Sequence, residues 1–359
     1  SEERRTLVLL VDHHVTLSNM AQQRNLDDPA TVLEFANIVK TQTHLDYLML
    51  VTLADGQGTT DAWSDWKELL VWQLYRAASR YLLDQEAFLA QSKIERDGLR
   101  AAVTEKLSPD FADEIDAHFD YMPDNYFRAF GTEEIAAHLE LFRTLWRGIY
   151  SEEKSPLAPL LRWEQPPKQG HTAVSICTWD RGHLLERIAG AFTVASVNIL
   201  SADVFIRGDN LVLDVFRVRS KKLGLVDDPF EIHLVETTLR HVLLVERYDF
   251  APLLASVRWK TAKGAPEIDF PTRITVENKS HPTSTLLQVE TPDRLGLLYD
   301  LVACMGRQDV YITLARISTD KGAAVDTFYV TDATTRGKIL DPKRIALLQE
   351  GLHAAVSST

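Results

Sequence analysis

The eight residues TWDRGHLL, at positions 178–185, recur later in the chain as TPDRLGLL, at positions 291–298. An Asn-Ile pair at 198–199 and a Tyr-Ile pair at 311–312 follow the two copies at the same distance. Each copy then has a strand-like segment with Asp-x-Phe, LDVFRV at 213–218 and VDTFYV at 325–330. Similar residues at matched positions over roughly 40 residues indicate an internal repeat. The sequence therefore predicts two copies of one fold.

The first copy has the periodicity of a small mixed α/β unit. The turn Arg207-Gly208-Asp209-Asn210 has the composition of a hairpin. The resulting order is β-α-β-β-α, one strand short of a ferredoxin-like unit. The expected elements are strand 171–178, helix 184–195, strands 199–207 and 211–218, and helix 230–245.

The first 150 residues have helical spacing instead. From Leu7, apolar residues recur every three to four positions through Leu17 and Ala21, which predicts one amphipathic helix. Asp28 and Pro29 favour a capped start for the next helix. Further helices are expected at 45–54, from about Asp61, at 79–105, at 109–118 and at 132–150.

The predicted fold class is therefore α+β, an all-helical region followed by two ferredoxin-like βαββαβ units. Prolines 156, 159, 166 and 167 favour a linker after the helices. The predicted boundaries are helical region 1–150, linker 151–170, first unit 171–258, linker 259–283 and second unit 284–359.

Composition excludes several classes of protein. The net charge of −12 argues against a nucleic-acid partner or electrostatic attachment to anionic lipid. Apolar runs are too short for a membrane-spanning helix, and the N-terminal residues do not resemble a signal peptide. Cys177 and Cys304 fall in segments expected to be buried and do not resemble a disulfide framework. A cytoplasmic protein is expected.

Strand, Asp-Arg-x-Gly-Leu-Leu, helix, Asn-Ile and a hairpin with Asp-x-Phe together resemble the ACT domain. In that family the glycine-bearing turn and the helix N-terminus often form an amino-acid site at a domain interface. Exposed N–H groups there favour a carboxylate, and a nearby aspartate can accept the ammonium group. The resemblance assigns ligand binding to Asp180, Arg181, Gly182 and Asn198 in the first copy and to Asp293, Arg294, Gly296 and Leu297 in the second.

Ordinary structural roles compete with this assignment, because Asp often caps a helix and Gly often permits a turn. The copies also depart from the family pattern. His183 occupies the aligned glycine position, so the first turn is expected to be reshaped. Tyr311 stands where the first copy has Asn198. One site is therefore degraded, or the two copies differ in ligand.

The N-terminal half adds motifs similar to those of the bacterial PII-protein uridylyltransferase/uridylyl-removing enzymes. They are HHVTLSNMAQQRNLDDP at 13–29, TLAD at 52–55, WSDWK at 63–67, and MPDNYF at 122–127 ahead of EIA at 134–136. Together with two ACT-like copies, the resemblance covers nearly the whole chain. It implies the end of an HD hydrolase domain, a connector and two ACT modules.

The same resemblance implies glutamine as effector, the PII signalling protein as partner, and an intramolecular ACT pair or a homodimer. Two alternatives remain open: a stand-alone amino-acid sensor without catalytic activity, and a metal-binding phosphohydrolase remnant. The sequence has no Gly-Ser-x-x-Asp-x-Asp element for nucleotidyl transfer and no His-Asp dipeptide for an HD metal centre. No catalytic residue is assigned.

Two residues are candidate ligands for a divalent metal in the HD remnant. Helical spacing places His14 on the same face as Leu17, toward the core, and Asp55 on the face of Thr52. A buried carboxylate is costly unless it is paired or metal-bound. The competing hypotheses are a core histidine bonded to backbone, and a carboxylate in the last helical turn near Gly56. No other cofactor is implied.

Overall fold

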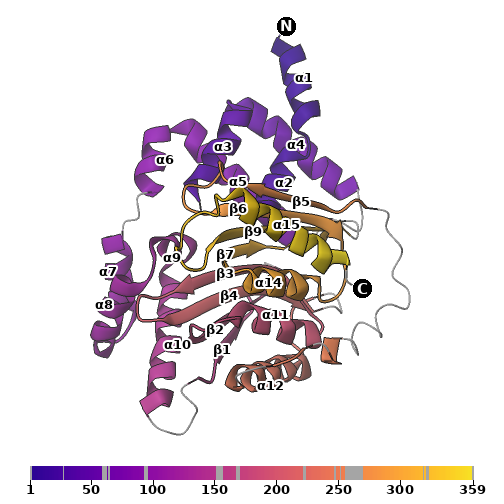
Figure 1. Ribbon diagram of the computed structural model, residues 1–359. Coiled ribbons are helices and arrows are strands. Elements are labelled where there is room, and N and C mark those ends of the chain that lie inside the picture. The colour runs from indigo at the N-terminus through magenta and orange to yellow at the C-terminus, as the bar shows by residue number, and fades with distance from the viewer. Residues whose placement is uncertain are drawn as a thin grey trace.

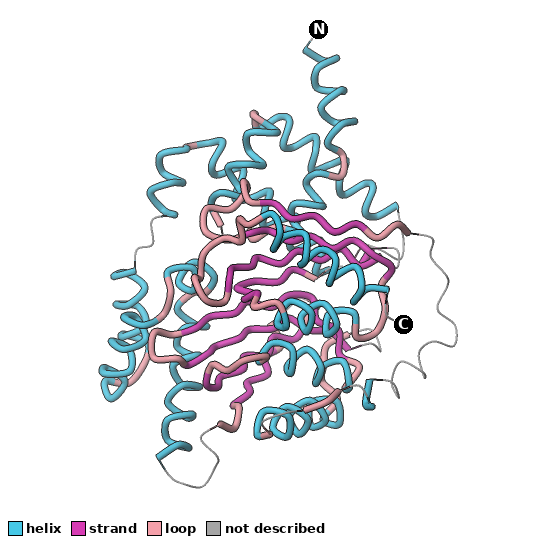
Figure 2. Tube along the Cα trace, in the orientation of Figure 1, coloured by secondary structure: helices cyan, strands magenta, loops and turns pink. Residues whose placement is uncertain are grey.

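The computed structural model describes residues 2–357 except 27, 59–62, 64, 93–95, 151–156, 167–169, 221–223, 246–247, 251, 255–269, 318 and 321–322. It has a helical N-terminal region and one long antiparallel sheet (Figures 1 and 2). The predicted α+β fold class is confirmed. Among the described residues, no helix combines the length and apolar character needed to cross a bilayer.

The described residues up to Ser92 form six helices that share one apolar core. Asp28 caps the third, because its carboxylate accepts a hydrogen bond from the Ala30 N–H and Pro29 sets the first helical φ. Leu17, Phe35 and Leu74 are fully buried in this core. The helices are α1 Glu2–His13, α2 Thr16–Gln23, α3 Pro29–Val39, α4 Gln42–Gly58, α5 Asp65–Leu83 and α6 Gln85–Ser92.

The single helix expected to start near Leu7 is wrong. Helix α1 ends at His13 and α2 begins at Thr16, so the apolar spacing continues across a break. Leu7 and Val11 are 63% and 70% exposed. The expected helix 79–105 is likewise divided among α5, α6 and α7, and the helix start near Asp61 lies outside the described residues. The spacing of apolar residues alone does not reveal where one helix ends and the next begins.

A second helical group, which we call the connector, follows. Its apolar core includes Tyr126 and Phe142 and extends directly onto sheet residues Phe205 and Leu213. The connector consists of α7 Arg96–Lys106, a 3-10 turn Pro109–Phe111, α8 Ala112–Tyr121, α9 Asp124–Ala129 and α10 Thr132–Tyr150.

Two repeated units then build the sheet. The first comprises β1 Leu160–Glu164, β2 Thr172–Trp179, α11 Leu184–Val194, β3 Val197–Ile206, β4 Leu211–Ser220 and α12 Pro229–Leu244. The second comprises β5 Arg273–Glu277, β6 Thr285–Pro292, α14 Leu297–Arg307, β7 Val310–Arg316, β8 Thr319–Asp320, β9 Ala323–Asp332 and α15 Pro342–Ser357. Both carry an irregularity at the same place, between Ile199 and Ser201 and between Ile312 and Leu314. The two copies therefore share one topology.

The strand missing from the predicted unit precedes it in the chain. Strand β1 pairs antiparallel with β2, and β5 pairs in the same way with β6, so the described residues of each unit hold four main strands and two helices, and the second unit adds the two-residue β8. Both extra strands lie in stretches predicted to be linkers, and that prediction is wrong for them. Pro159 and Pro166 flank β1 at the sheet edge, where proline is tolerated. Pro156 and Pro167 lie outside the described residues.

Pairing of β3 with β7 joins the units edge to edge. The strand order is β1-β2-β4-β3-β7-β9-β6-β5, with β8 attached to β9. Helices α11, α12, α14 and α15 cover one face, and the N-terminal helices and connector lie on the other (Figure 1). Alternation along β4 follows this layering, because Val212 and Phe216 join the core under the helices whereas Leu213 and Val215 join the connector core.

We expect the core beneath α11 and α12 to determine the stability of the first unit. Phe216 is 0% exposed there, so Phe216→Ala should lower the free energy of unfolding by about 3–5 kcal/mol. Phe230, which is 71% exposed, is the matched control, and Phe230→Ala should change the free energy of unfolding by less than about 0.5 kcal/mol. Chemical denaturation monitored by circular dichroism measures both. Equal effects would contradict the described layering.

Candidate functional site

The repeated turns adopt one backbone conformation. His183, at the start of α11, has φ 63°, and Gly296, at the start of α14, has φ 81°. The reshaped first turn expected from His183 is therefore wrong, because the histidine accepts the left-handed conformation that glycine adopts in the second copy. The His183 Nδ1 lies 2.8 Å from the Glu186 Oε2. This pair holds the imidazole beside the helix start.

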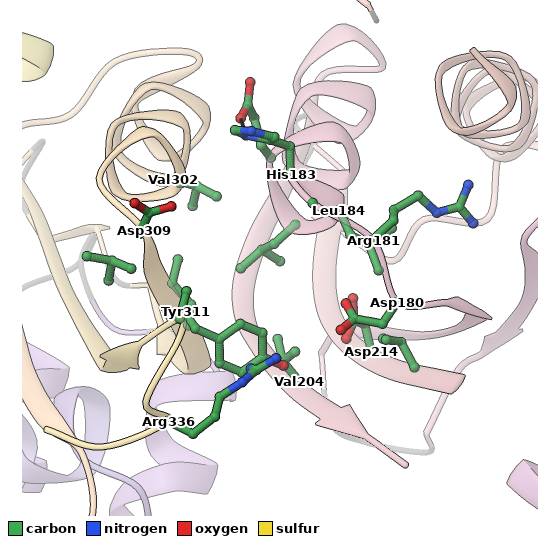
Figure 3. Close-up of a pocket in the computed structure, with 18 residues that line it drawn as sticks. Asp180, Arg181, His183, Leu184, Val204, Asp214, Val302, Asp309, Tyr311 and Arg336 are labelled. Carbon is green, nitrogen blue, oxygen red and sulfur yellow. Dashed lines mark hydrogen bonds and ion pairs between the residues drawn. The ribbon is translucent and has the colours of Figure 1, made fainter. Parts of the chain in front are cut away.

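A cavity of about 320 Å³ lies between the first unit's turn and the second unit (Figure 3). Residues 180–186 form one wall together with side chains of β3 and β4. Residues of α14, β7 and the loop after β9 form the opposite wall. This volume suits a small metabolite. The cavity therefore belongs to the junction between the units rather than to either unit alone.

Two carboxyl groups stand together at the inner end of the cavity. Asp180 is half-buried, and Asp214, from β4, is 1% exposed (Figure 3). The Asp214 Oδ1 has no hydrogen-bond partner among the described residues. Burial raises the pKa of Asp214 well above its ordinary value, and the negative charge of Asp180 raises it further. Asp214 therefore keeps its proton to a higher pH than an exposed aspartate.

The second unit supplies the opposite wall. Tyr311, from β7, points into the cavity, and the guanidinium carbon of Arg336 lies 4.0 Å from the centroid of its ring (Figure 3). Burial raises the pKa of the Tyr311 hydroxyl, as do the charges of Asp214 and Asp180, so this hydroxyl stays neutral. Arg336 is exposed. The cavity thus has carboxyl groups inside and a cation at its mouth.

The predicted ligand residues divide into two groups. Asp180, Arg181 and Gly182 line the cavity. Five others do not line it, and of these Asn198 and Asp293 are exposed. The residues outside the cavity are Asn198, Asp293, Arg294, Gly296 and Leu297.

The two repeated arginines have a structural role. The Arg181 side chain turns away from the cavity and donates hydrogen bonds to the Leu243 carbonyl, 2.6 Å away, and the Leu157 carbonyl, 3.0 Å away (Figure 3). Arg294 donates to the Ala355 carbonyl at 2.9 Å. Leu243 and Ala355 lie in the last turns of α12 and α15, where carbonyls lack helical partners. Each arginine therefore ties its turn to the second helix of its unit.

The cavity residues not assigned to the site from the sequence include Asp214, Asp309, Tyr311 and Arg336. One signal was present, because Asp214 interrupts the apolar run at 211–216, where every residue of the strand is buried. The other three come from the second unit. Their place beside the first turn depends on the β3–β7 pairing, which no local pattern indicates.

The expected placement of His14 and Asp55 toward the core is wrong. Both are exposed, and α4 continues past Asp55 to Gly58 rather than ending near Gly56. The His14 Nδ1 lies 2.8 Å from the Val11 carbonyl. No group of three or more His, Cys, Asp or Glu in the described part of the chain is arranged to hold a metal. The metal role of these two residues stays a prediction that the geometry does not support.

The β3–β4 hairpin connects the cavity to the connector. The Asp180 N–H donates to the Asn210 carbonyl at 2.8 Å, and the Gly208 N–H donates to the Tyr121 carbonyl at 3.0 Å. The Arg207 guanidinium lies 3.5 Å from the His118 Nδ1. One short turn therefore touches the ligand-facing loop on one side and α8 on the other.

A buried polar chain continues from that point. The Tyr126 hydroxyl lies 3.0 Å from the His118 Nε2 and 2.9 Å from the His138 Nδ1, and the His138 Nε2 lies 3.4 Å from the Ser175 hydroxyl of β2. Burial lowers the pKa of His138 to about 3 and lowers that of His118 as well. Both imidazoles are therefore neutral. The chain fixes the connector against the first unit.

Substitutions of the two arginines near the cavity should change the free energy of unfolding by different amounts. Arg181→Ala removes hydrogen bonds to the carbonyls of buried Leu243 and of Leu157, and should lower the free energy of unfolding by about 1–3 kcal/mol. Arg336→Ala removes an exposed side chain and should change it by less than about 0.5 kcal/mol. Thermal unfolding measures both variants. A larger loss from Arg336→Ala would contradict these roles.

The pKa of Asp214 predicts the sign of a pH effect. A carboxyl group whose pKa is raised by folding stabilises the protein at low pH, and this contribution is lost as the pH rises through the folded-state value. Asp214→Asn should therefore melt at an increasingly higher temperature than the wild type as the pH is raised from about 4 to about 8. Exposed Asp113 is the control, and Asp113→Asn should show no such trend. A pH-independent difference for Asp214→Asn would show that this carboxyl is ionised in the folded protein.

Comparison with known proteins adds two findings. A family model described as an ACR9-like, ACT-like domain matches residues 273–359. The match starts at β5, whereas the sequence predicted a start at 284, because β5 belongs to the second unit's sheet.

Similar sequences are bacterial proteins named bifunctional uridylyltransferase/uridylyl-removing enzyme. The relative from Gluconobacter oxydans is 28% identical over 374 residues, covering 99% of this chain and 37% of the relative. The one from Rhodospirillum rubrum is 30% identical over 364 residues, covering 100% of this chain and 37% of the relative. The one from Idiomarina loihiensis is 31% identical over 337 residues, covering 92% of this chain and 37% of the relative. The chain thus spans little more than a third of these relatives' length.

Proposed function

The chain is homologous to the C-terminal part of bacterial bifunctional uridylyltransferase/uridylyl-removing enzymes, and from that premise we propose that it is a regulatory region that binds an amino acid between its two ACT-like units. The observation that carries this proposal is the cavity shared by both units. The turn that the family resemblance assigns to ligand binding forms one wall of that cavity.

The chemistry of the walls suits a zwitterion. The N-terminus of α11 and the Arg336 guanidinium favour a carboxylate, whereas Asp180 can accept hydrogen bonds from an ammonium group. The volume of about 320 Å³ accommodates a side chain of moderate length. By family resemblance, we propose glutamine as this amino acid.

Ligand binding would favour the arrangement in which the two units are paired. A molecule in the cavity contacts both walls, so it binds more tightly when β3 and β7 lie together than when the units separate. A difference in affinity of about 1–3 kcal/mol between arrangements is typical of allosteric coupling. The ligand therefore acts through differential affinity and needs no chemical step.

The β3–β4 hairpin is the route by which this preference would reach the helices. Its Asn210 accepts a hydrogen bond from Asp180, and its Gly208 donates one to Tyr121 of the connector. A shift of the ligand-facing turn would therefore move α8 and the buried chain through Tyr126. By family resemblance, we propose that the output controls attachment and removal of uridylyl groups on the PII signalling protein.

Calorimetric titration with L-glutamine tests this proposal. We expect saturable binding that Asp180→Ala weakens by about 10–100-fold, since a charge-assisted hydrogen bond is lost. Asp293→Ala, at the matched position of the second turn, is the control and should leave affinity unchanged. Loss of binding in Asp293→Ala alone would place the ligand at the other turn, and no binding of any amino acid to the wild type would reject the function.

A further inference from the structure

Asp214 is a buried carboxyl group that the fold itself does not use. It lies in β4 on the face covered by α11 and α12, between Val212 and Phe216 of the apolar core. Its Oδ1 has no partner among the described residues, although the side chain lines the cavity. An unsatisfied buried acceptor costs stability, so its retention calls for a ligand that satisfies it.

The groups around Asp214 determine its ionisation. Asp180 stands beside it on the first turn, Tyr311 faces it from β7, and Arg336 lies at the mouth against the tyrosine ring (Figure 3). His183 and Glu186 bond to each other on α11, and Asp309 lines the cavity from the turn before β7. The Arg181 guanidinium is engaged elsewhere by backbone carbonyls. The nearest charge is therefore negative, and Asp214 keeps its proton while the cavity is empty.

We propose that Asp214 determines specificity for a ligand with an ammonium group, and that it releases its proton to solvent as that group binds. This role of Asp214 rests on the proposed amino-acid site. It specifies which ligands that site selects and how many protons are released on binding. The empty site holds the neutral carboxylic acid. The occupied site holds a carboxylate hydrogen-bonded to R–NH3+, with one H+ released and no other bond made or broken.

The ammonium group makes this exchange favourable. A cation beside Asp214 stabilises its charged form and compensates the loss of solvation that keeps the carboxyl neutral in the empty cavity. A 2-hydroxy acid of the same shape offers no such cation and leaves Asp214 protonated. Discrimination against analogues that lack a required polar group can be large, because buried partners then stay unpaired.

The sign of the pH dependence follows from the proton balance. Binding that releases a proton is opposed by low pH, so affinity rises by up to about tenfold per pH unit while Asp214 is protonated in the empty site. The rise stops once the empty site itself ionises. Ligand sensing would thus weaken as the solution becomes acidic.

The experiment is calorimetric titration of the full chain with L-glutamine and with its 2-hydroxy analogue, in two buffers of different ionisation enthalpy. For the wild type we expect release of about one proton per glutamine and a preference for glutamine of about 100-fold or more. Asp214→Asn should bind glutamine with no proton release and with most of that preference lost. Asp326→Asn, at the matched position of β9, is the control and should behave as wild type.

These outcomes distinguish a failure of the role of Asp214 from a failure of the amino-acid site. Glutamine binding without proton release in the wild type, or release that persists in Asp214→Asn, would overturn the role of Asp214 and leave the amino-acid site intact. Loss of proton release in Asp326→Asn alone would assign the role to the second unit, and would also overturn the role of Asp214. Absence of amino-acid binding to the wild type would instead reject the proposed function. If Asp214→Asn folds poorly, proton release on glutamine binding to the wild type still tests the role of Asp214.

Discussion

Antiparallel pairing of β3 with β7 is the constraint on which the site depends. Three residue pairs among the described residues form it, centred on Ala202 and Ala315, and the Ile317 N–H adds a 3.0 Å hydrogen bond to the Leu200 carbonyl. Asp203, buried at this junction, lies 2.5 Å from the Arg217 guanidinium and 4.0 Å from that of Arg316. The junction places the first unit's turn opposite Tyr311. Without it, both walls of the cavity would face solvent.

The repeat is symmetric in backbone and asymmetric in chemistry. The same left-handed turn residue, strand irregularity and arginine tie occur in both units. The wall facing the first turn carries Asp309 and Tyr311, whereas the corresponding positions of the first unit carry Ser196 and Asn198. The two units thus share one architecture, whereas the charged and aromatic groups at these positions belong to one unit only. A duplicated fold need not hold two equal sites.

Local pattern predicted much of the fold, including both repeated units, the cap at Asp28 with Pro29 in the first helical turn, and helix α10. It did not predict β1, a five-residue strand between prolines that pairs along its length with β2. It misplaced His14, since helical spacing persists across a change of helix. For the site, the turn was predictable from the repeat, but Tyr311 and Arg336 reach it through a pairing between distant strands. The pattern also could not show that the Arg181 guanidinium donates to backbone carbonyls, because an arginine beside a ligand turn can equally cap a helix.

Native-state hydrogen exchange at the junction tests the central claim most directly. If β3 and β7 pair in solution, amides in 201–203 and 314–316 should exchange as slowly as those of the inner strands β4 and β9. The outer strands β1 and β5 provide the internal reference, because each has one unpaired edge. Exchange of the junction amides as fast as the unpaired amides of β1 and β5 would show that the units do not form one sheet, and the cavity between them would not exist.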